Sequence, residues 1–195
     1  MPQQSRCRTH RVRAKSVAGN TMHNNSLQRL VRNIQDVPAP GVTFRDITPL
    51  IGDPAGFDEA VRSVVSLAEG KAIDKVVGIE ARGFILAAPV AFHLKAGFVP
   101  VRKPGKLPWE VVSEKYQLEY GTDELEIHRD AVQPGDRVVI VDDVLATGGT
   151  ANAAIRLVEG LGATVVGLLF LIELTALGGR DVLGARSIEA VMTYS

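Results

Sequence analysis

The chain has 195 residues, 46% of them hydrophobic, and its 22 basic and 22 acidic residues give a formal net charge of zero. This size and composition are typical of one globular domain, and they exclude a membrane-spanning helix, since no run approaches about eighteen apolar residues. The single cysteine, Cys7, excludes an internal disulfide and favours the cytoplasm, and the four histidines lack the spacing of a zinc site.

The N-terminal segment differs in charge from the rest of the chain. Residues 1–35 contain seven lysines and arginines and no acidic residue. Such a segment is compatible with a nucleic-acid contact or an organelle-targeting peptide, but residues 1–21 show no apolar periodicity, which favours disorder. We therefore predict a basic, disordered tail over residues 1–25 and one folded domain over residues 26–195, with no nucleic-acid or membrane partner.

Deleting residues 1–21 is expected to leave the melting temperature and any activity unchanged, because a disordered tail contributes no packing to the folded domain. Thermal melting and activity of the full chain and of a chain starting at Met22 compare the two directly. A large loss of either quantity would make the tail part of the fold or of the site.

Strand-like and helix-like segments alternate along the rest of the chain. Helical patterns occupy DPAGFDEAVRSVVSLAEG, which begins at a capping Asp53 and ends on Gly70, and GFILAAPVAFHLKAG. Short apolar runs predict strands at residues 75–79, 98–101, 137–141 and 164–172. This alternation predicts an α/β fold with a central, mainly parallel sheet that is flanked by helices on both faces.

Residues 102–122, RKPGKLPWEVVSEKYQLEYGT, interrupt the alternation with charges, prolines, glycines and aromatic residues in no clean period. A connection of this length in a compact domain is more often a functional lid or an excursion hairpin than an idle loop. Three cations within its first five residues, Arg102, Lys103 and Lys106, suit a ligand with several negative charges, although a solvated basic loop is the default interpretation.

The segment from Arg137 to Thr150, RVVIVDDVLATGGT, places an acidic pair and a glycine-rich turn directly after a predicted strand. In a parallel sheet ligands bind at the carboxyl ends of the strands, and a glycine turn that opens a helix offers backbone N–H groups to a phosphate. The carboxylates of Asp142 and Asp143 would repel a phosphate but can accept hydrogen bonds from sugar hydroxyls. A ribose 5-phosphate satisfies both halves of the segment.

This segment resembles the phosphoribosyl pyrophosphate-binding motif of the type I phosphoribosyltransferases. Four further segments resemble the adenine phosphoribosyltransferase family in the same order: VPAPGVTFRDITPLI, GIEARGFILAAPVA, VRKPGKLPWEVVSEKYQLEYGTDELEIH and LIELTALGGRDVL. The resemblance covers nearly everything from Leu27 to Ser195. It implies the type I fold, with a small hood over the base and a flexible lid loop. It also implies transfer of the phosphoribosyl group of 5-phosphoribosyl-1-pyrophosphate to adenine, which gives AMP and pyrophosphate.

The resemblance also implies roles for individual residues. Arg82 would hold the pyrophosphate, and the peptide bond from Glu80 to Ala81 would be cis. Glu119 would be the acid–base group at the purine ring nitrogens, and Tyr120 would help to close the site. Binding of the substrates would involve Asp142, Asp143, Ala146, Thr147, Gly148, Gly149 and Thr150 for the ribose and its phosphate, Arg102, Lys103 and Lys106 for the pyrophosphate, and Thr43, Phe44, Arg45 and Leu174 for the base.

Magnesium is implied as a cofactor that is carried by the pyrophosphate, with no direct protein ligand, and a homodimer is implied in which Arg102 reaches the neighbouring subunit. Two alternatives stay open. One is another base, a 6-oxopurine or orotate, because many relatives carry an aliphatic residue where Thr43 stands. The other is a regulator that binds the ligand without turnover and contacts nucleic acid through its basic tail, although residues 1–35 contain no helix-turn-helix pattern.

Overall fold

A five-stranded parallel sheet forms the centre of the computed structural model, which describes residues 26–118 and 121–195. The strand order is β4-β3-β7-β8-β9, and every neighbouring pair is parallel. The prediction of an α/β fold with a central parallel sheet is confirmed. The strands are β3 (Lys75–Ile79), β4 (Gly97–Val101), β7 (Arg137–Leu145), β8 (Thr164–Leu174) and β9 (Ile188–Tyr194).

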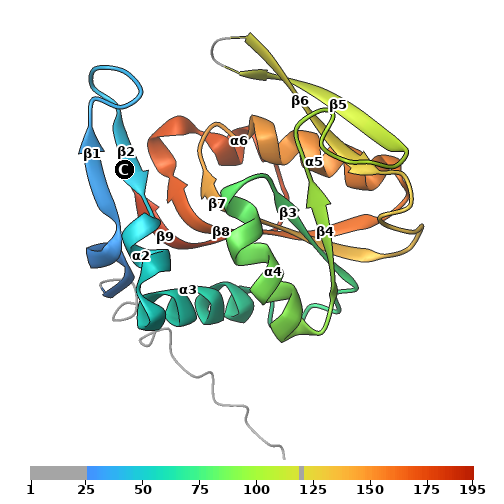
Figure 1. Ribbon diagram of the computed structural model, residues 1–195, viewed down its shortest axis with the longest axis horizontal. Helices are drawn as coiled ribbons and strands as arrows, with labels where there is room; N and C mark the ends of the chain where they lie inside the picture. Colours follow the sequence, from blue (N-terminus) through green and yellow to red (C-terminus); the bar gives the residue numbers. More distant parts are fainter. Residues whose placement is uncertain (1–25, 119–120) are drawn as a thin grey trace, which may run out of the picture.

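Helices cover both faces of this sheet (Figure 1), and α3 (Pro54–Leu67) and α4 (Arg82–Leu94) lie on one side while α5 (Gly149–Gly160) and the short α6 (Gly179–Leu183) lie on the other. Successive buried residues of β7 alternate between the two layers, since Val139 packs in the core with α3 and α4 and Val138 packs in the core with α5. Strands that are buried on both faces have continuous apolar runs, which explains why the sequence reveals them. No described helix is long and apolar enough to cross a membrane.

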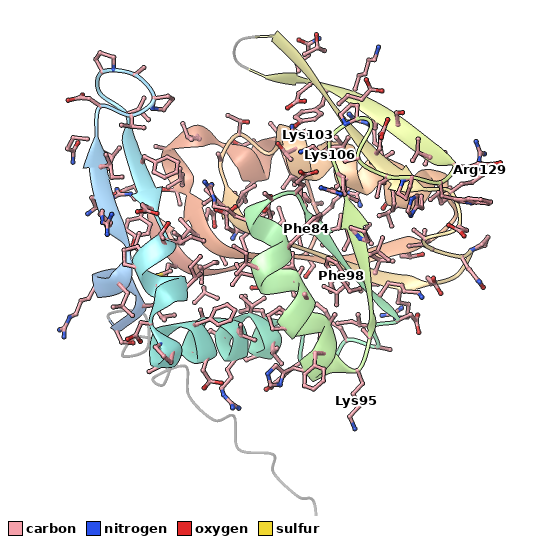
Figure 2. All side chains as sticks on the ribbon, viewed as in Figure 1. Phe84, Lys95, Phe98, Lys103, Lys106 and Arg129 are labelled. Atoms are coloured by element: carbon pink, nitrogen blue, oxygen red, sulfur yellow. The ribbon has the colours of Figure 1, made fainter. Side chains whose placement is uncertain are left out.

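The two predicted helices begin close to their expected starts. The Asp53 carboxylate accepts a hydrogen bond from the Gly56 N–H at 2.7 Å, which confirms the N-cap of α3. This helix ends at Leu67, short of the predicted Gly70, because the chain turns there and Gly70 adopts a φ of +76°. Helix α4 packs on β4 through Phe84 and Phe98, whose rings meet edge to face at 5.7 Å (Figure 2).

Strands β7 and β8 extend beyond the apolar runs that predict them, β7 to Leu145 and β8 to Leu174. Strand β7 continues past Val141 to Leu145, and its pairing with β8 includes Asp142 opposite Phe170 and Leu145 opposite Glu173. The acidic pair therefore lies inside the strand, not after its end as the sequence predicts, because ladder hydrogen bonds hold these residues extended. Strand β9 is absent from the prediction.

Two antiparallel pieces stand on either side of the carboxyl edge of the sheet (Figure 1). The hood consists of β1 (Arg32–Gln35) and β2 (Thr43–Asp46), followed by α2 (Thr48–Gly52). The hairpin consists of β5 (Val111–Leu118) and β6 (Gly121–His128), so the hairpin alternative for residues 102–122 is confirmed and extends to His128. Two backbone hydrogen bonds between Arg102 and Glu126, of 2.9 and 2.7 Å, join the root of the hairpin to the end of β4.

Candidate active site

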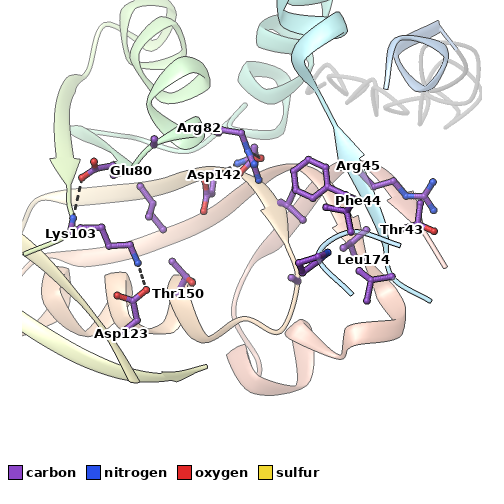
Figure 3. Close-up of a pocket in the computed structure, with 18 of the residues that line it drawn as sticks. Thr43, Phe44, Arg45, Glu80, Arg82, Lys103, Asp123, Asp142, Thr150 and Leu174 are labelled. Atoms are coloured by element: carbon purple, nitrogen blue, oxygen red, sulfur yellow. Dashed lines mark hydrogen bonds and ion pairs between the residues drawn. The ribbon is translucent and has the colours of Figure 1, made fainter. Parts of the chain in front are cut away.

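One cavity of about 560 Å³ lies between the hood, the hairpin and the carboxyl edge of the sheet (Figure 3). Its wall combines segments that are far apart in the sequence, because the parallel topology brings the ends of β3, β7 and β8 to one edge. Predicted site residues that line it are Thr43, Phe44, Arg45, Arg82, Lys103, Asp142, Asp143, Ala146, Thr150 and Leu174.

Arg82 connects the acidic pair with the hood. Its Nε donates a hydrogen bond to Asp143 Oδ2 at 2.5 Å, and its guanidinium lies 5.3 Å from the centre of the Phe44 ring. Burial and the negative charge of Asp143 raise the pKa of the Asp142 carboxyl well above its usual value, while Arg82 acts in the opposite direction. The guanidinium of Arg82 thus lies between the acidic pair and Phe44 of the hood.

Gly83 allows the first turn of α4 to approach β7 closely. A Cβ at this position would lie 2.6 Å from Asp142 Oδ1 and 3.2 Å from the Val141 carbonyl oxygen. Only a residue without a side chain fits there while Asp142 keeps its place. Just before α4, the peptide bond from Glu80 to Ala81 is cis, as the resemblance implies.

The Glu80 carboxylate lies among the cations that follow β4. It accepts hydrogen bonds from Lys106 Nζ at 2.6 Å, Arg102 Nε at 3.1 Å and the Lys103 N–H at 3.1 Å. Burial opposes ionisation, but the hydrogen bonds from Lys106 and Arg102 dominate and lower the pKa of Glu80 to about 2. Arg102 and Lys106 are therefore engaged by Glu80, and they do not line the cavity.

Lys103 reaches from β4 into the cavity and contacts the hairpin (Figures 2 and 3). Its ammonium forms an ion pair with Asp123 of β6 and donates a hydrogen bond to Tyr116 Oη of β5 at 3.1 Å. The Tyr116 hydroxyl in turn donates to Asp123 at 3.0 Å. Burial opposes the charges, but the hydrogen bonds outweigh it, so the pKa of Lys103 is raised and that of Asp123 is lowered.

Residues 146–150, which are predicted to bind a phosphate and are named the phosphate loop here, run from the end of β7 into the first turn of α5. Ala146 and Thr150 line the large cavity, and Thr147 and Gly148 line an adjoining cavity of about 70 Å³. Helix α5 begins directly after Gly148, which has a φ of +83°. The first N–H groups of a helix have no partner within it, so this loop presents free donors at the positive end of the helix dipole.

One end of the cavity lies under the hood, where Phe44 and Leu174 provide an aromatic and an aliphatic surface. The side chains next to Phe44 are engaged elsewhere. The Thr43 hydroxyl donates to Gln35 Oε1 at 3.0 Å, and the Arg45 guanidinium lies 4.2 Å from the centre of the Tyr194 ring. Because these two side chains are engaged, the backbone of β2 is the part of this segment that could contact the edge of a bound base.

A family model, related sequences and solved structures all indicate the same family. The family model of the phosphoribosyl transferase domain matches residues 58–183. The adenine phosphoribosyltransferase of Acidothermus cellulolyticus is 57% identical over 162 residues, which are 83% of this chain and 92% of that protein. The chain belongs to the adenine phosphoribosyltransferase family.

Solved adenine phosphoribosyltransferases share the fold over most of the chain. The structure from Thermoanaerobacter pseudethanolicus has a TM-score of 0.85 at 49% identity, covering 87% of this chain and 99% of that one. The structure from Saccharomyces cerevisiae has a TM-score of 0.83 at 36% identity, covering 88% of this chain and 99% of that one. The predictions of the family and of a type I phosphoribosyltransferase fold are therefore confirmed.

Seen as an adenine phosphoribosyltransferase, the chain brings most of its predicted site residues into one cavity. Thr147 and Gly148 line only the adjoining cavity. Arg102 and Lys106 bind Glu80, and Gly149 lies under the hairpin with a Cβ position 3.2 Å from the Gln117 carbonyl oxygen. The predictions for Glu119, Tyr120 and the tail over residues 1–25 lie outside the described residues. Their roles stay predictions.

Sequence reasoning missed several residues of the site. Glu80 is not predicted to contact the cations of the lid segment, and Asp123 and Tyr116 are not predicted to contact Lys103. The position of Glu80 at the carboxyl end of the 75–79 strand is a signal that could have indicated it. On the hood side Val37, Pro38 and Val42 also line the cavity and were not predicted.

An Asp142→Asn variant is expected to melt at a higher temperature than the wild type and to turn over more slowly. An amide oxygen can still accept the Asp143 N–H, which lies 2.9 Å from Asp142 Oδ1, but it carries no buried charge. Folding raises the pKa of Asp142, so its ionisation destabilises the folded protein as pH rises from the ordinary value to the raised one. The gain in melting temperature should therefore grow as the pH rises from the ordinary value of an aspartate, about 4, toward the raised pKa of Asp142.

Asp58→Asn is the matched control for this variant. Asp58 lies on α3 with a side chain that is 57% exposed, and a hydrogen bond from Arg62 lowers its pKa. This variant is not expected to be stabilised at any pH. An Asp142→Asn protein that melts like the wild type across the whole range would contradict the assignment of a raised pKa.

Proposed function

We propose that this chain transfers the 5-phosphoribosyl group of 5-phosphoribosyl-1-pyrophosphate to adenine and releases AMP and pyrophosphate. The observation that carries the proposal is the cavity itself. A slot between Phe44 and Leu174, an acidic pair and a phosphate loop follow one another along its wall, as base, ribose and phosphate do in AMP. The relative from Saccharomyces cerevisiae was crystallised with a base, adenine, and with a bisphosphate, an iminoaltritol 1,6-bisphosphate.

The ribose end of the substrate would be held by groups that take no part in bond breaking. The backbone N–H groups and hydroxyls from Ala146 to Thr150 would bind the 5-phosphate, and Asp142 and Asp143 would accept hydrogen bonds from the ribose hydroxyls. Binding energy at these remote groups would position the anomeric carbon between base and pyrophosphate. That carbon develops positive charge as pyrophosphate departs, and the adjacent carboxylates suit this charge.

The leaving group would be met by the cations of the cavity. Arg82 already bridges Asp143 and the hood, and Lys103 extends into the same space from the end of β4. Lys103 is paired with Asp123, so binding of pyrophosphate would exchange this carboxylate for a phosphate oxygen. The exchange would couple ligand binding to the hairpin, because Asp123 belongs to β6.

Magnesium fits this site as an ion that enters with pyrophosphate. The described residues contain no group of three or more His, Cys, Asp or Glu side chains that could hold a metal ion. Arg82 and Lys103 would instead hold the pyrophosphate that carries it, and the oxygen-rich ligand suits magnesium. When bound, the ion would supply charge neutralisation for the leaving group.

Adenine would lie between Phe44 and Leu174 with its edge against the backbone of β2. The new bond forms at a ring nitrogen that must lose its proton. We assign Glu119 to accept that proton and Tyr120 to help close the site, in line with the resemblance of LEYG to the family. Closure over the cavity would exclude water from the positively charged carbon.

Three further parts of the proposal concern the whole protein: residues 26–195 form one phosphoribosyltransferase domain, the chain assembles as a homodimer, and it works in the cytoplasm. The family model over residues 58–183 supports the first part. The second and third follow from the family resemblance and from the presence of a single cysteine. Light scattering on the purified chain measures the assembly, and a monomeric mass at working concentrations would contradict the homodimer.

The test of function is pyrophosphate release from 5-phosphoribosyl-1-pyrophosphate in the presence of magnesium, with adenine, hypoxanthine, guanine and orotate in parallel. Release with adenine alone is the expected result, and AMP should form in equal amount. Faster release with another base would reassign the specificity. Silence with every base, combined with a rise in melting temperature when the phosphoribosyl ligand is added, would favour a regulator that binds without turnover.

Removing magnesium with a chelator is expected to abolish pyrophosphate release and to leave the melting temperature of the ligand-free protein unchanged. The first effect follows because magnesium would neutralise the leaving group, and the second because the described residues form no cluster of metal ligands. Adding magnesium in excess of the chelator should restore turnover. Full activity in the chelator would contradict the proposed role of the ion.

A further inference from the structure

The turn formed by residues 178–180 lies directly behind the phosphate loop. A Cβ on Gly179 would overlap the Ala146 carbonyl oxygen and lie 2.8 Å from Leu145 Cδ1. From the other side, a Cβ on Gly148 would lie 2.7 Å from the Gly179 carbonyl oxygen and 3.3 Å from its Cα. The backbones of the two segments therefore approach each other closely at Gly148 and Gly179.

This turn has little stability of its own. It opens α6, which has five residues and ends at Leu183, and Gly178 at its start has a φ of +66°. An isolated helix of this length does not form in water, because one or two turns do not offset the cost of nucleation. The position of the turn must come from contacts with the rest of the protein.

A bidentate ion pair supplies such a contact. Arg180 donates from Nε to Glu173 Oε1 at 2.6 Å and from its NH2 group to Oε2 at 2.8 Å. A third hydrogen bond runs from the NH1 group to the Ile188 carbonyl oxygen at 3.0 Å. Glu173 is only 4% exposed and pairs with Leu145 in the ladder between β8 and β7, so its carboxylate is fixed close to the start of the phosphate loop.

We propose that Arg180 and Gly179 are positioning residues for the phosphate loop: the pair between Arg180 and Glu173 presses the 178–180 turn against Ala146 and Gly148 and so sets the affinity for the 5-phosphate. This inference rests on the proposed function, because it assigns the loop to a phosphoribosyl ligand. Neither residue lines the large cavity or the adjoining one, so any effect on binding must pass through the loop.

The test compares Gly179→Ala with Gly160→Ala. Gly160 ends α5, and a Cβ there would meet nothing within 4 Å, so this control adds the same methyl group at a free position. Because a shift of about 1 Å in a positioning element can cost up to about a hundredfold, Gly179→Ala is expected to raise the KM for 5-phosphoribosyl-1-pyrophosphate at least tenfold. The KM for adenine should stay within about twofold, since the slot between Phe44 and Leu174 is untouched.

Two further measurements separate positioning from loss of fold. Arg180→Lys keeps a cation beside the buried Glu173 but loses the two-pronged contact, and it is expected to raise the same KM by less than Gly179→Ala does. The rise in melting temperature on adding 5-phosphoribosyl-1-pyrophosphate and magnesium without adenine measures binding alone, and it should shrink in both variants. If either variant melts lower but binds the ligand like the wild type, the contact is only structural and the inference is wrong.

The two proposals fail in different ways. If the wild type releases no pyrophosphate with any base but is stabilised by the phosphoribosyl ligand, the transferase proposal falls and the melting shifts still decide the role of Gly179. If the ligand does not stabilise the wild type at all, the phosphate loop has no phosphoribosyl ligand and both proposals are wrong.

Discussion

An Arg82→Ala variant is expected to lose about a hundredfold or more in kcat/KM for 5-phosphoribosyl-1-pyrophosphate, the size of effect seen when one electrostatic stabiliser is removed from an active site. Arg82 is placed to act on both the leaving group and the acidic pair, since it bonds Asp143 at 2.5 Å and lies over the Phe44 ring. Without it, two adjacent carboxylates would face an anionic substrate, and the pKa of Asp142 would rise further. Steady-state kinetics with adenine in excess measure the loss.

Arg62→Ala is the matched control for Arg82→Ala. Arg62 lies on α3 and also bonds an aspartate, Asp58, at 2.7 Å, but both side chains are exposed and neither lines the cavity. Its removal is expected to leave kcat/KM within about twofold, because exposed pairs contribute little. Near-normal turnover in Arg82→Ala would refute the assignment of this residue to the site.

A Gly83→Ala variant is expected to lower both turnover and stability. The added Cβ would meet Asp142 Oδ1 at 2.6 Å and the Val141 carbonyl oxygen at 3.2 Å, so either Asp142 or the first turn of α4 must move. Overpacking of this kind costs about 1–3 kcal/mol of stability. A displaced Asp142 could no longer hold the ribose, and we expect kcat/KM to fall at least tenfold because reacting groups are misplaced.

The control for Gly83→Ala is Gly52→Ala at the end of α2, where an added Cβ meets nothing within 4 Å. This variant is expected to behave like the wild type in both thermal melting and kinetics. If Gly83→Ala does the same, then the close approach of α4 to β7 has no bearing on the position of Asp142.

The sequence reveals those strands whose burial on both faces produces a continuous apolar run. Strand β3 matches its prediction at both ends, because a strand buried on both faces shows as an unbroken apolar run. Strand β9 was missed because it forms the edge of the sheet and its residues alternate irregularly between buried and exposed. The extension of β7 through Asp142 was also missed. Pairing with β8 keeps Asp142 in the strand, and the charged residues around Asp142 do not reveal that pairing.

The predicted site residues come from one continuous segment or match a family motif, whereas the contacts that were missed join separate strands. The phosphate loop and the acidic pair belong to one continuous segment, so their chemistry can be predicted from local order. Glu80 meets Arg102 only because the parallel register sets Ile79 beside Val101, which places the next residues of both strands together. Tyr116 meets Asp123 because they are direct partners across the hairpin. Such contacts follow from strand register, which depends on how two strands pair and not on the order of residues within one segment.

The Glu80 cluster bears on how fast a substrate arrives. With a pKa of about 2, Glu80 stays ionised well below neutral pH, and its one negative charge meets the two positive charges of Arg102 and Lys106. These three groups therefore carry one net positive charge beside the cavity while Glu80 is ionised. Such a charge attracts a polyanion over roughly the 8 Å Debye length of physiological salt. Association of 5-phosphoribosyl-1-pyrophosphate should accordingly slow as ionic strength rises while remaining insensitive to moderate acidification.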